Sequence, residues 1–159
     1  MFIIAGRNCN WSNEDLVSYI PKEFYNKFIL ADEVENIHQI FARLDLLLVT
    51  SSWGESFPNV IVEALMESCL CVSTDIGAAK DILEHDQFIA NIGSADELSS
   101  KSIEILNWEK SIRIQYLKKI RQKIINKYSL ENISKLYSGI YWKIFIVILI
   151  FNFVQTYNQ

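Results

Sequence analysis

Cysteine is scarce in this sequence of 159 residues, which has only Cys9, Cys69 and Cys71. A disulfide framework needs paired cysteines at the spacings of secreted domains, and one Cys-x-Cys pair cannot supply the four ligands of a structural zinc site. The cysteine pattern therefore argues against a disulfide scaffold and indicates no metal centre. A reducing, cytoplasmic compartment is the default expectation.

Positive charge is also in short supply. The sequence has 15 Lys and Arg residues and 19 Asp and Glu residues, which gives a net charge of -4 and a pI near 5.2. This balance gives no electrostatic case for a nucleic-acid partner, and the basic residues between positions 110 and 135 are expected to be a solvated helix face. Half of the residues are apolar and 21% are charged, which is typical of a globular protein of about one domain.

Long apolar runs are absent. The longest one, residues 144–151, has eight residues, well short of the roughly 20 needed to span a bilayer. We expect residues 141–159 to form an apolar C-terminal tail that is buried or meets a partner, and membrane contact through it is the less favoured alternative. The chain starts directly with an apolar strand pattern, which leaves no room for a signal peptide. A cytoplasmic protein is expected, with a peripheral location at the inner face of the membrane as the alternative.

Short apolar runs alternate with segments of helical periodicity along the chain. This alternation predicts an α/β fold with a doubly wound parallel sheet, ending in α-helices. The expected strands lie at residues 1–6, 28–30, 46–49 and 70–73, and the expected helices at 12–20, 32–44, 59–66, 77–83, 95–106 and 108–127. Ligands bind such sheets at the carboxyl ends of the strands, where the loops at Gly6, Leu30, Ser52 and Asp75 are expected to open.

Residues 51–65 connect a predicted buried strand to a predicted helix. The unbroken apolar run at 46–49 is typical of a strand covered on both faces. Pro58 fits the first turn of the helix, because the backbone N–H that proline lacks would have no partner within the helix there. From there the helix is apolar nearly all round, and only Asn59, Glu63 and Glu67 share a polar stripe. That stripe is expected to face a cleft, a partner or solvent.

The start of this helix is suited to binding a polar ligand. Backbone N–H groups there, those of Ser56, Phe57 and Asn59 among them, are donors for an anion. The carboxylates of Glu55 and Glu63 can accept protons from paired hydroxyls of a sugar or a ribose. The competing interpretation is structural: an acid at a helix N-terminus stabilises the helix by roughly 0.3–1 kcal/mol without any ligand, and a helical glutamate is usually solvated.

Glu55 and Glu63, separated by seven residues, resemble the acid-seven-acid motif of retaining glycosyltransferases of family 4 with the GT-B fold. Residues 71–77 resemble the next strand and turn of that family, and the likeness extends over about residues 2–137. It implies a Rossmann-like, C-terminal donor-binding half at residues 1–140, lacking its first strand-helix unit. A sugar-nucleotide epimerase of similar fold is a less favoured alternative to the glycosyltransferase family.

The resemblance implies that the donor is a nucleoside-diphosphate sugar of the UDP or GDP type, with no metal and no other cofactor. Glu55 would contact the donor sugar hydroxyls and favour the transition state, and Glu63 would hold the ribose hydroxyls. Backbone N–H groups would face the sugar and phosphate, from Ser56, Phe57, Asn59 and Val60. The loop at residues 30–34 would lie beside the nucleotide base. A hexose would be transferred with retention to an acceptor, expected to be a glycan or glycolipid of polysaccharide biosynthesis.

The chain also departs from the family pattern. Gly6-Arg7 superficially resembles the family's diphosphate-binding site, but it aligns with the second strand, so the Arg and Lys of the first strand are expected to be absent. An acceptor-binding domain or subunit would be a separate partner. We therefore expect the chain alone to transfer sugar poorly or not at all, and a catalytically inactive nucleotide-sugar-binding module is the alternative function. His38 is interpreted as a surface or core-edge residue.

Overall fold

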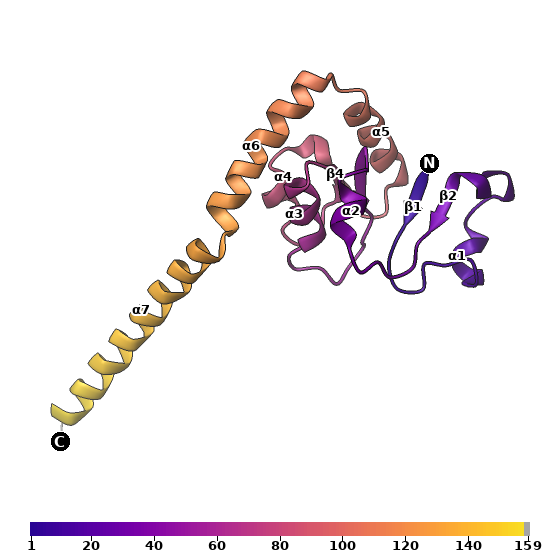
Figure 1. Cartoon of the computed structure of the whole chain (residues 1–159). Helices are drawn as coiled ribbons and strands as arrows, with labels where there is room; N and C mark the ends of the chain where they lie inside the picture. The colour runs from indigo at the N-terminus through magenta and orange to yellow at the C-terminus, as the bar shows by residue number, and fades with distance from the viewer. Residues whose placement is uncertain (158–159) are drawn as a thin grey trace. The chain divides into compact units, whose positions relative to one another are not determined.

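The computed structural model describes the backbone of residues 1–157 and the side chains of residues 1–144. The chain divides into two compact units, residues 1–43 and the part from Leu44 onward, and each is described by itself (Figure 1). Both units contain parallel strands joined through helices. The predicted α/β class is thereby confirmed, with the strands divided between two parallel sheets.

The first unit is built on a pair of parallel strands, β1 (Phe2–Ile4) and β2 (Phe28–Leu30). The chain runs between them through α1 (Glu14–Ser18) and a short 3-10 helix, η1 (Lys22–Lys27). The helix predicted from residue 12 begins two residues later, and the Ser12 hydroxyl donates to Asn10 Oδ1. The carboxamide oxygen of Asn13 caps the helix by accepting the N–H of Leu16 at 3.1 Å.

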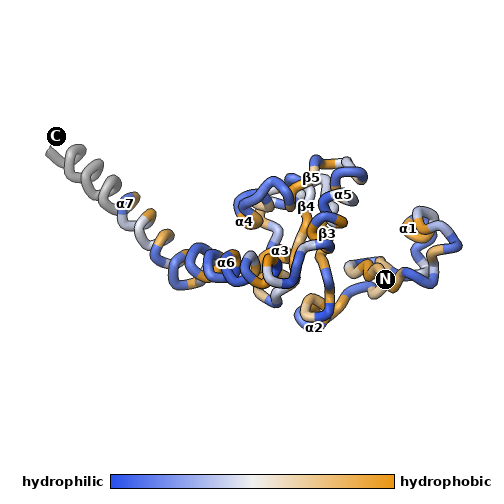
Figure 2. Tube along the Cα trace, turned by 90° about the horizontal axis from the view of Figure 1, so that it is seen from above, coloured by the Kyte–Doolittle hydropathy of each residue, from blue (hydrophilic) through white to orange (hydrophobic). Residues whose placement is uncertain are grey.

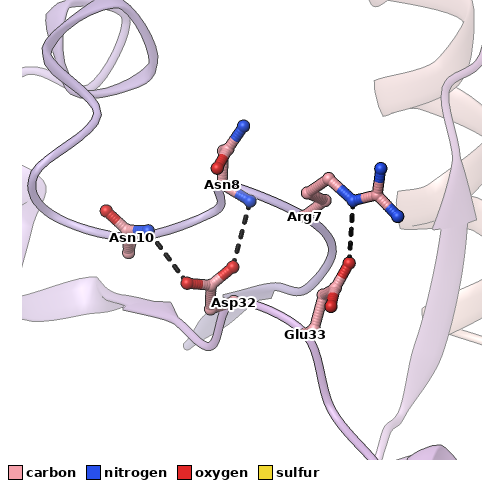
Figure 3. Close-up of polar contacts among 5 residues, drawn as sticks. All are labelled: Arg7, Asn8, Asn10, Asp32 and Glu33. Carbon is pink, nitrogen blue, oxygen red and sulfur yellow. Dashed lines mark hydrogen bonds and ion pairs between the residues drawn. The ribbon is translucent and has the colours of Figure 1, made fainter.

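The helix predicted from residue 32 to residue 44 is much shorter, because α2 spans only Ile37–Phe41. Asp32 adopts a left-handed backbone conformation, with φ of +50°. Its carboxylate accepts hydrogen bonds from the Asn8 N–H at 3.0 Å and from Asn10 Nδ2 at 2.9 Å, as Figure 3 shows. These bonds hold the loop after β1 against the loop after β2, so an interaction with residues distant in sequence takes the place of the first helical turns.

We expect Asp32→Ala to loosen residues 1–43, because it leaves the Asn8 N–H and the Asn10 amide without their shared acceptor. Hydrogen exchange followed by mass spectrometry should show faster exchange in peptides from residues 1–31 and no change in peptides from residues 70–90. The matched control is Glu33→Ala, which removes only an exposed ion pair with Arg7 and should leave exchange nearly unchanged. Equal effects of the two variants would contradict this account.

The second unit contains a sheet of three parallel strands in the order β3 (Leu46–Val49), β4 (Leu70–Thr74) and β5 (Ile89–Ala90). The crossovers pass through α3 (Asn59–Met66) and α4 (Ala79–Leu83). Right-handed crossovers that step in one direction across a sheet place their helices on the same face. Figures 1 and 2 show α3 and α4 on one side of β4 and α5 (Ala95–Leu106) on the other.

Strand β4 is the centre of this unit, since all five of its residues are buried. Complete burial raises the pKa of the Cys71 thiol well above its ordinary value. The expectation that residues 46–49 are covered on both faces is only partly met, because Leu48 is 39% exposed. The physical reason is that β3 is an edge strand of its sheet.

Two helices complete the second unit. Helix α6 (Lys110–Tyr128) contributes Ile120 and Ile124 to the core, and α3 is among its contacts. Helix α7 (Leu130–Tyr157) follows, and its backbone shows no break at residue 141. The boundary between residues 140 and 141 stays a prediction, since the side chains after Ile144 lie outside the described residues. Within the described part of the chain, no helix combines the length and the apolar character needed to cross a bilayer.

Candidate functional site at the carboxyl edge of the second sheet

Two loops meet where β3 and β4 end: residues 50–58 lead into α3, and residues 75–78 lead into α4. The Ala78 N–H donates to the Ser56 carbonyl oxygen at 2.9 Å. The Thr74 hydroxyl, buried at the end of β4, donates to the Ser51 carbonyl oxygen at 2.6 Å. Backbone and side-chain bonds therefore fix both the beginning and the end of the loop that carries Glu55.

Gly77 is the point of closest approach between these loops. Its φ is +51°, a left-handed conformation that glycine adopts without strain. A Cβ atom at this position would lie 2.5 Å from the Ser56 carbonyl oxygen and 2.6 Å from that of Glu55. Any larger residue would therefore have to displace the backbone of Glu55 and Ser56, which makes Gly77 the residue that sets the position of the predicted site loop.

The end of the loop is anchored in the core. Pro58 is fully buried and stands one residue before α3 rather than in its first turn. The rings of Phe57 and Tyr128 make an edge contact at 5.1 Å, which joins the loop to the end of α6. Gly77 and Tyr128 were not predicted to support the loop. The signal for Gly77 was its position at the turn between a predicted strand and a predicted helix, whereas no local pattern marks Tyr128.

The predicted backbone donors lie together at this end of α3. None of their N–H groups donates a hydrogen bond to another residue in the described part of the chain. These are the N–H groups of Ser56, Phe57, Asn59 and Val60. Unpaired donors at a helix start carry partial positive charge, so the geometry can accept an anionic or polar oxygen.

The two predicted carboxylates come from different elements. Glu55 lies exposed in the loop, and Glu63 is half-buried in the second turn of α3, with Asn59 exposed at the start of that helix and Glu67 exposed at its C-cap. Neither the Glu55 nor the Glu63 carboxylate forms an ion pair or hydrogen bond with a residue that the structure describes. Both are thus available as acceptors for hydroxyl groups of a ligand.

A separate feature lies in the first unit, where the chain was predicted to meet the nucleotide base. Gly6, Arg7, Glu33 and Val34 are among the residues around an open cavity of about 480 Å³. Arg7 Nε donates to a Glu33 carboxylate oxygen at 2.9 Å (Figure 3). His38 lies exposed on α2, in agreement with its interpretation as a surface residue. Among the residues that the structure describes, no group of three or more His, Cys, Asp and Glu could hold a metal ion.

Residues 1–107 match the protein family described as glycosyl transferases group 1. Among curated proteins, N-acetyl-alpha-D-glucosaminyl L-malate synthase of Bacillus anthracis is 22% identical over 121 residues, covering 75% of this chain and 31% of the synthase. A glycosyltransferase structure from Rickettsia africae ESF-5 matches with a TM-score of 0.74 and 18% identity, over 90% of this chain and 39% of that chain. Anabaena Alr3699/HepE in complex with UDP-glucose matches with a TM-score of 0.50 and 25% identity, over 80% of this chain and 40% of that chain.

Parallel strands, alternating helices and a long C-terminal helix define the class of this protein as the C-terminal half of a GT-B fold. Because the family match covers 107 of the 159 residues, the chain belongs to the glycosyl transferases group 1 family. The chain spans about a third of the length of the curated relative and about two fifths of the solved structures.

We expect Gly77→Ala to destabilise the second unit more than Gly93→Ala does. Both glycines have positive φ, so both substitutions carry a backbone strain of about 1–2 kcal/mol. Only Gly77 has backbone within 3 Å of the new Cβ, which should cost about 1–3 kcal/mol more. Urea unfolding followed by circular dichroism measures the difference, and equal losses for the two variants would show that the loops do not depend on this contact.

Proposed function

We propose that the carboxyl edge of the second sheet holds the sugar and diphosphate part of a nucleoside-diphosphate sugar. The observation that carries this proposal is the loop at residues 50–58, whose backbone is held by Gly77 while its N–H donors and the Glu55 carboxylate stay unpaired. A rigid loop with unpaired polar groups loses little conformational entropy when it binds a polar ligand. The Anabaena relative, 25% identical, was solved in complex with UDP-glucose, which supports the same ligand class here.

The proposed roles follow from the chemistry of each group. The unpaired N–H groups of Ser56, Phe57, Asn59 and Val60 would donate to phosphate and sugar oxygens. Glu55, in the loop, would accept hydroxyl protons of the donor sugar. Glu63, two turns along α3, would accept the ribose hydroxyls. A carboxylate that accepts from two neighbouring hydroxyls makes charge-assisted hydrogen bonds, which are among the stronger polar contacts in proteins.

Membership of the family supports a retaining transfer of a hexose from this donor to an acceptor, with a glycan or glycolipid as the proposed acceptor class. In that reaction Glu55 would act by positioning the sugar and by electrostatic stabilisation of positive charge developing at the anomeric carbon. A separate acceptor domain or subunit remains part of the proposal. The second candidate is a nucleotide-sugar-binding module without transfer activity, which the unpaired N–H donors and carboxylates of the loop support equally, because holding a nucleotide sugar does not require its transfer.

Glutamine variants of the two acids should separate their roles in a calorimetric titration with UDP, GDP and the matching glucose nucleotides. Glu63→Gln should weaken both the nucleotide and the nucleotide sugar by roughly 10-fold or more, because each lost charge-assisted hydrogen bond is worth about 1.5–3 kcal/mol. Glu55→Gln should weaken the binding of the nucleotide sugar and leave the binding of the nucleotide alone unchanged. The matched control is Glu104→Gln, an exposed acid on α5, which should bind like the unaltered chain.

The two candidate functions differ in one further measurement. Incubation of the chain with radiolabelled UDP-glucose and a glycan or lipid acceptor, with and without a separately expressed acceptor domain, tests for transfer. Nucleotide-sugar binding with no transfer by the chain alone supports the binding module. Turnover by the chain alone at rates typical of enzymes, about 1 per second or faster, would contradict it. No binding of any nucleotide at millimolar concentration would overturn both.

A further inference from the structure

Charge is distributed very unevenly along this chain. Residues 1–109 contain 6 Lys and Arg residues against 18 acids, a net charge of -12, whereas residues 110–143 contain 9 Lys and Arg residues against one acid, Glu131, a net charge of +8. The overall value of -4 therefore conceals a strongly basic segment that coincides with α6 and the first half of α7. After Lys143 the sequence contains no charged residue.

The basic residues of α6 are largely without acidic partners. Lys118, Lys119, Lys123 and Lys127 lie along one open face of this helix, together with amide side chains. Lys123 pairs with Glu84, whereas Lys118, Lys119 and Lys127 form no ion pair with any residue in the described part of the chain. Three unpaired like charges along one face attract an extended anionic surface more than a single small anion.

The described part of α7 has a distinct apolar face. At 100° per residue, its aliphatic side chains and both tyrosines fall within an arc of about 140°, and the opposite side contains Ser, Asn, Glu and Lys together with Trp142. Those of the face that are at least half exposed are Leu130, Leu136, Tyr137, Ile140, Tyr141 and Ile144. Trp142, also exposed, stands beside Lys143 where the sequence passes into the apolar run of residues 144–151.

These two features together select the kind of partner. A second copy docked face to face would bring two charges of +8 together, and a nucleic acid would leave the aromatic and apolar residues of α7 without a role. A bilayer with anionic headgroups matches both, because lysines are attracted to its surface potential and Tyr and Trp side chains favour the headgroup level. The acidic remainder of the chain would be repelled from the same surface, which orients the molecule.

We propose that α6 and α7 form a docking surface for an anionic membrane, with the α6 lysines at the headgroups and the apolar face of α7 in the interface. The arrangement divides between two successive helices what an interfacial helix combines in one, a basic face and an apolar face. Stable binding to a membrane needs both contributions. A few lysines alone bind anionic headgroups weakly and reversibly, and burial of the apolar face adds the second contribution. This proposal is independent of the ligand at the carboxyl edge of the sheet.

Co-sedimentation of the full chain with sucrose-loaded vesicles tests the proposal. We expect the chain to pellet with phosphatidylcholine vesicles that contain phosphatidylglycerol, to stay in the supernatant with pure phosphatidylcholine, and to be released as salt rises. Lys118→Glu combined with Lys119→Glu should lower the partition coefficient at least about 10-fold. The matched control is Lys22→Glu combined with Lys27→Glu, the same charge change in exposed lysines of the first unit, which should leave binding unchanged.

The apolar half of the surface needs its own variant. Tyr137→Ser combined with Tyr141→Ser should weaken binding to the anionic vesicles, and Tyr19→Ser, at a still more exposed tyrosine on the first unit, should not. Circular dichroism spectra identical to that of the unaltered chain show that the variants are folded. Failure to pellet with anionic vesicles, unchanged binding of the Lys118/Lys119 variant, or a dimer in sedimentation velocity that dissociates in the Tyr137/Tyr141 variant would each overturn the proposal.

Discussion

The close contact between Gly77 and the backbone of Glu55 and Ser56 is the constraint on which the candidate site depends. Two loops that follow neighbouring parallel strands leave the sheet at the same edge, and here they approach so closely that no side chain fits between them. The Ala78 N–H and the Thr74 hydroxyl then use carbonyl oxygens of the first loop as acceptors. Loop 50–58 is in this way positioned by the second strand as much as by its own sequence.

The rest of the unit supports this contact. Strand β4 is buried on both faces because α3 and α4 cover one side and α5 covers the other. Helix α6 packs against α3 through its buried isoleucines, and its last residue, Tyr128, contacts Phe57 of the loop. In this member of the glycosyl transferases group 1 family, the loop that leads from Glu55 to the helix of Glu63 is thus held by contacts from β4, from the loop at Gly77 and from the end of α6.

The sequence predicted those elements whose signals are local. The strand at residues 46–49 and the helix at residues 95–106 were located to the residue, because an apolar run and helical periodicity are contained within a few positions. Glu55 and Glu63 lie on the loop and the helix where their position after a predicted strand placed them, and their roles at the site stay predictions.

The errors arose where distant residues compete for the backbone. Asp32 was expected to begin a helix, but its carboxylate binds residues 22 and 24 positions earlier in the chain, and no local pattern contains that information. The tight approach of Gly77 to Ser56 was missed for the same reason, since the two lie on successive strand-helix units. Interactions that depend on how two loops meet at a sheet edge cannot be derived from periodicity.

The backbone basis of the loop's position has a consequence for how this protein can change. Because the Glu55 side chain is exposed and the contact at Gly77 involves only main-chain atoms, substitution at position 55 would alter the chemistry offered to a ligand without moving the scaffold. Position 77, by contrast, accepts almost no variation. The fold thus separates an exposed side chain, whose chemistry can change without moving the backbone, from a fixed backbone position at Gly77, so that the polar groups presented at this edge can vary while the architecture is retained.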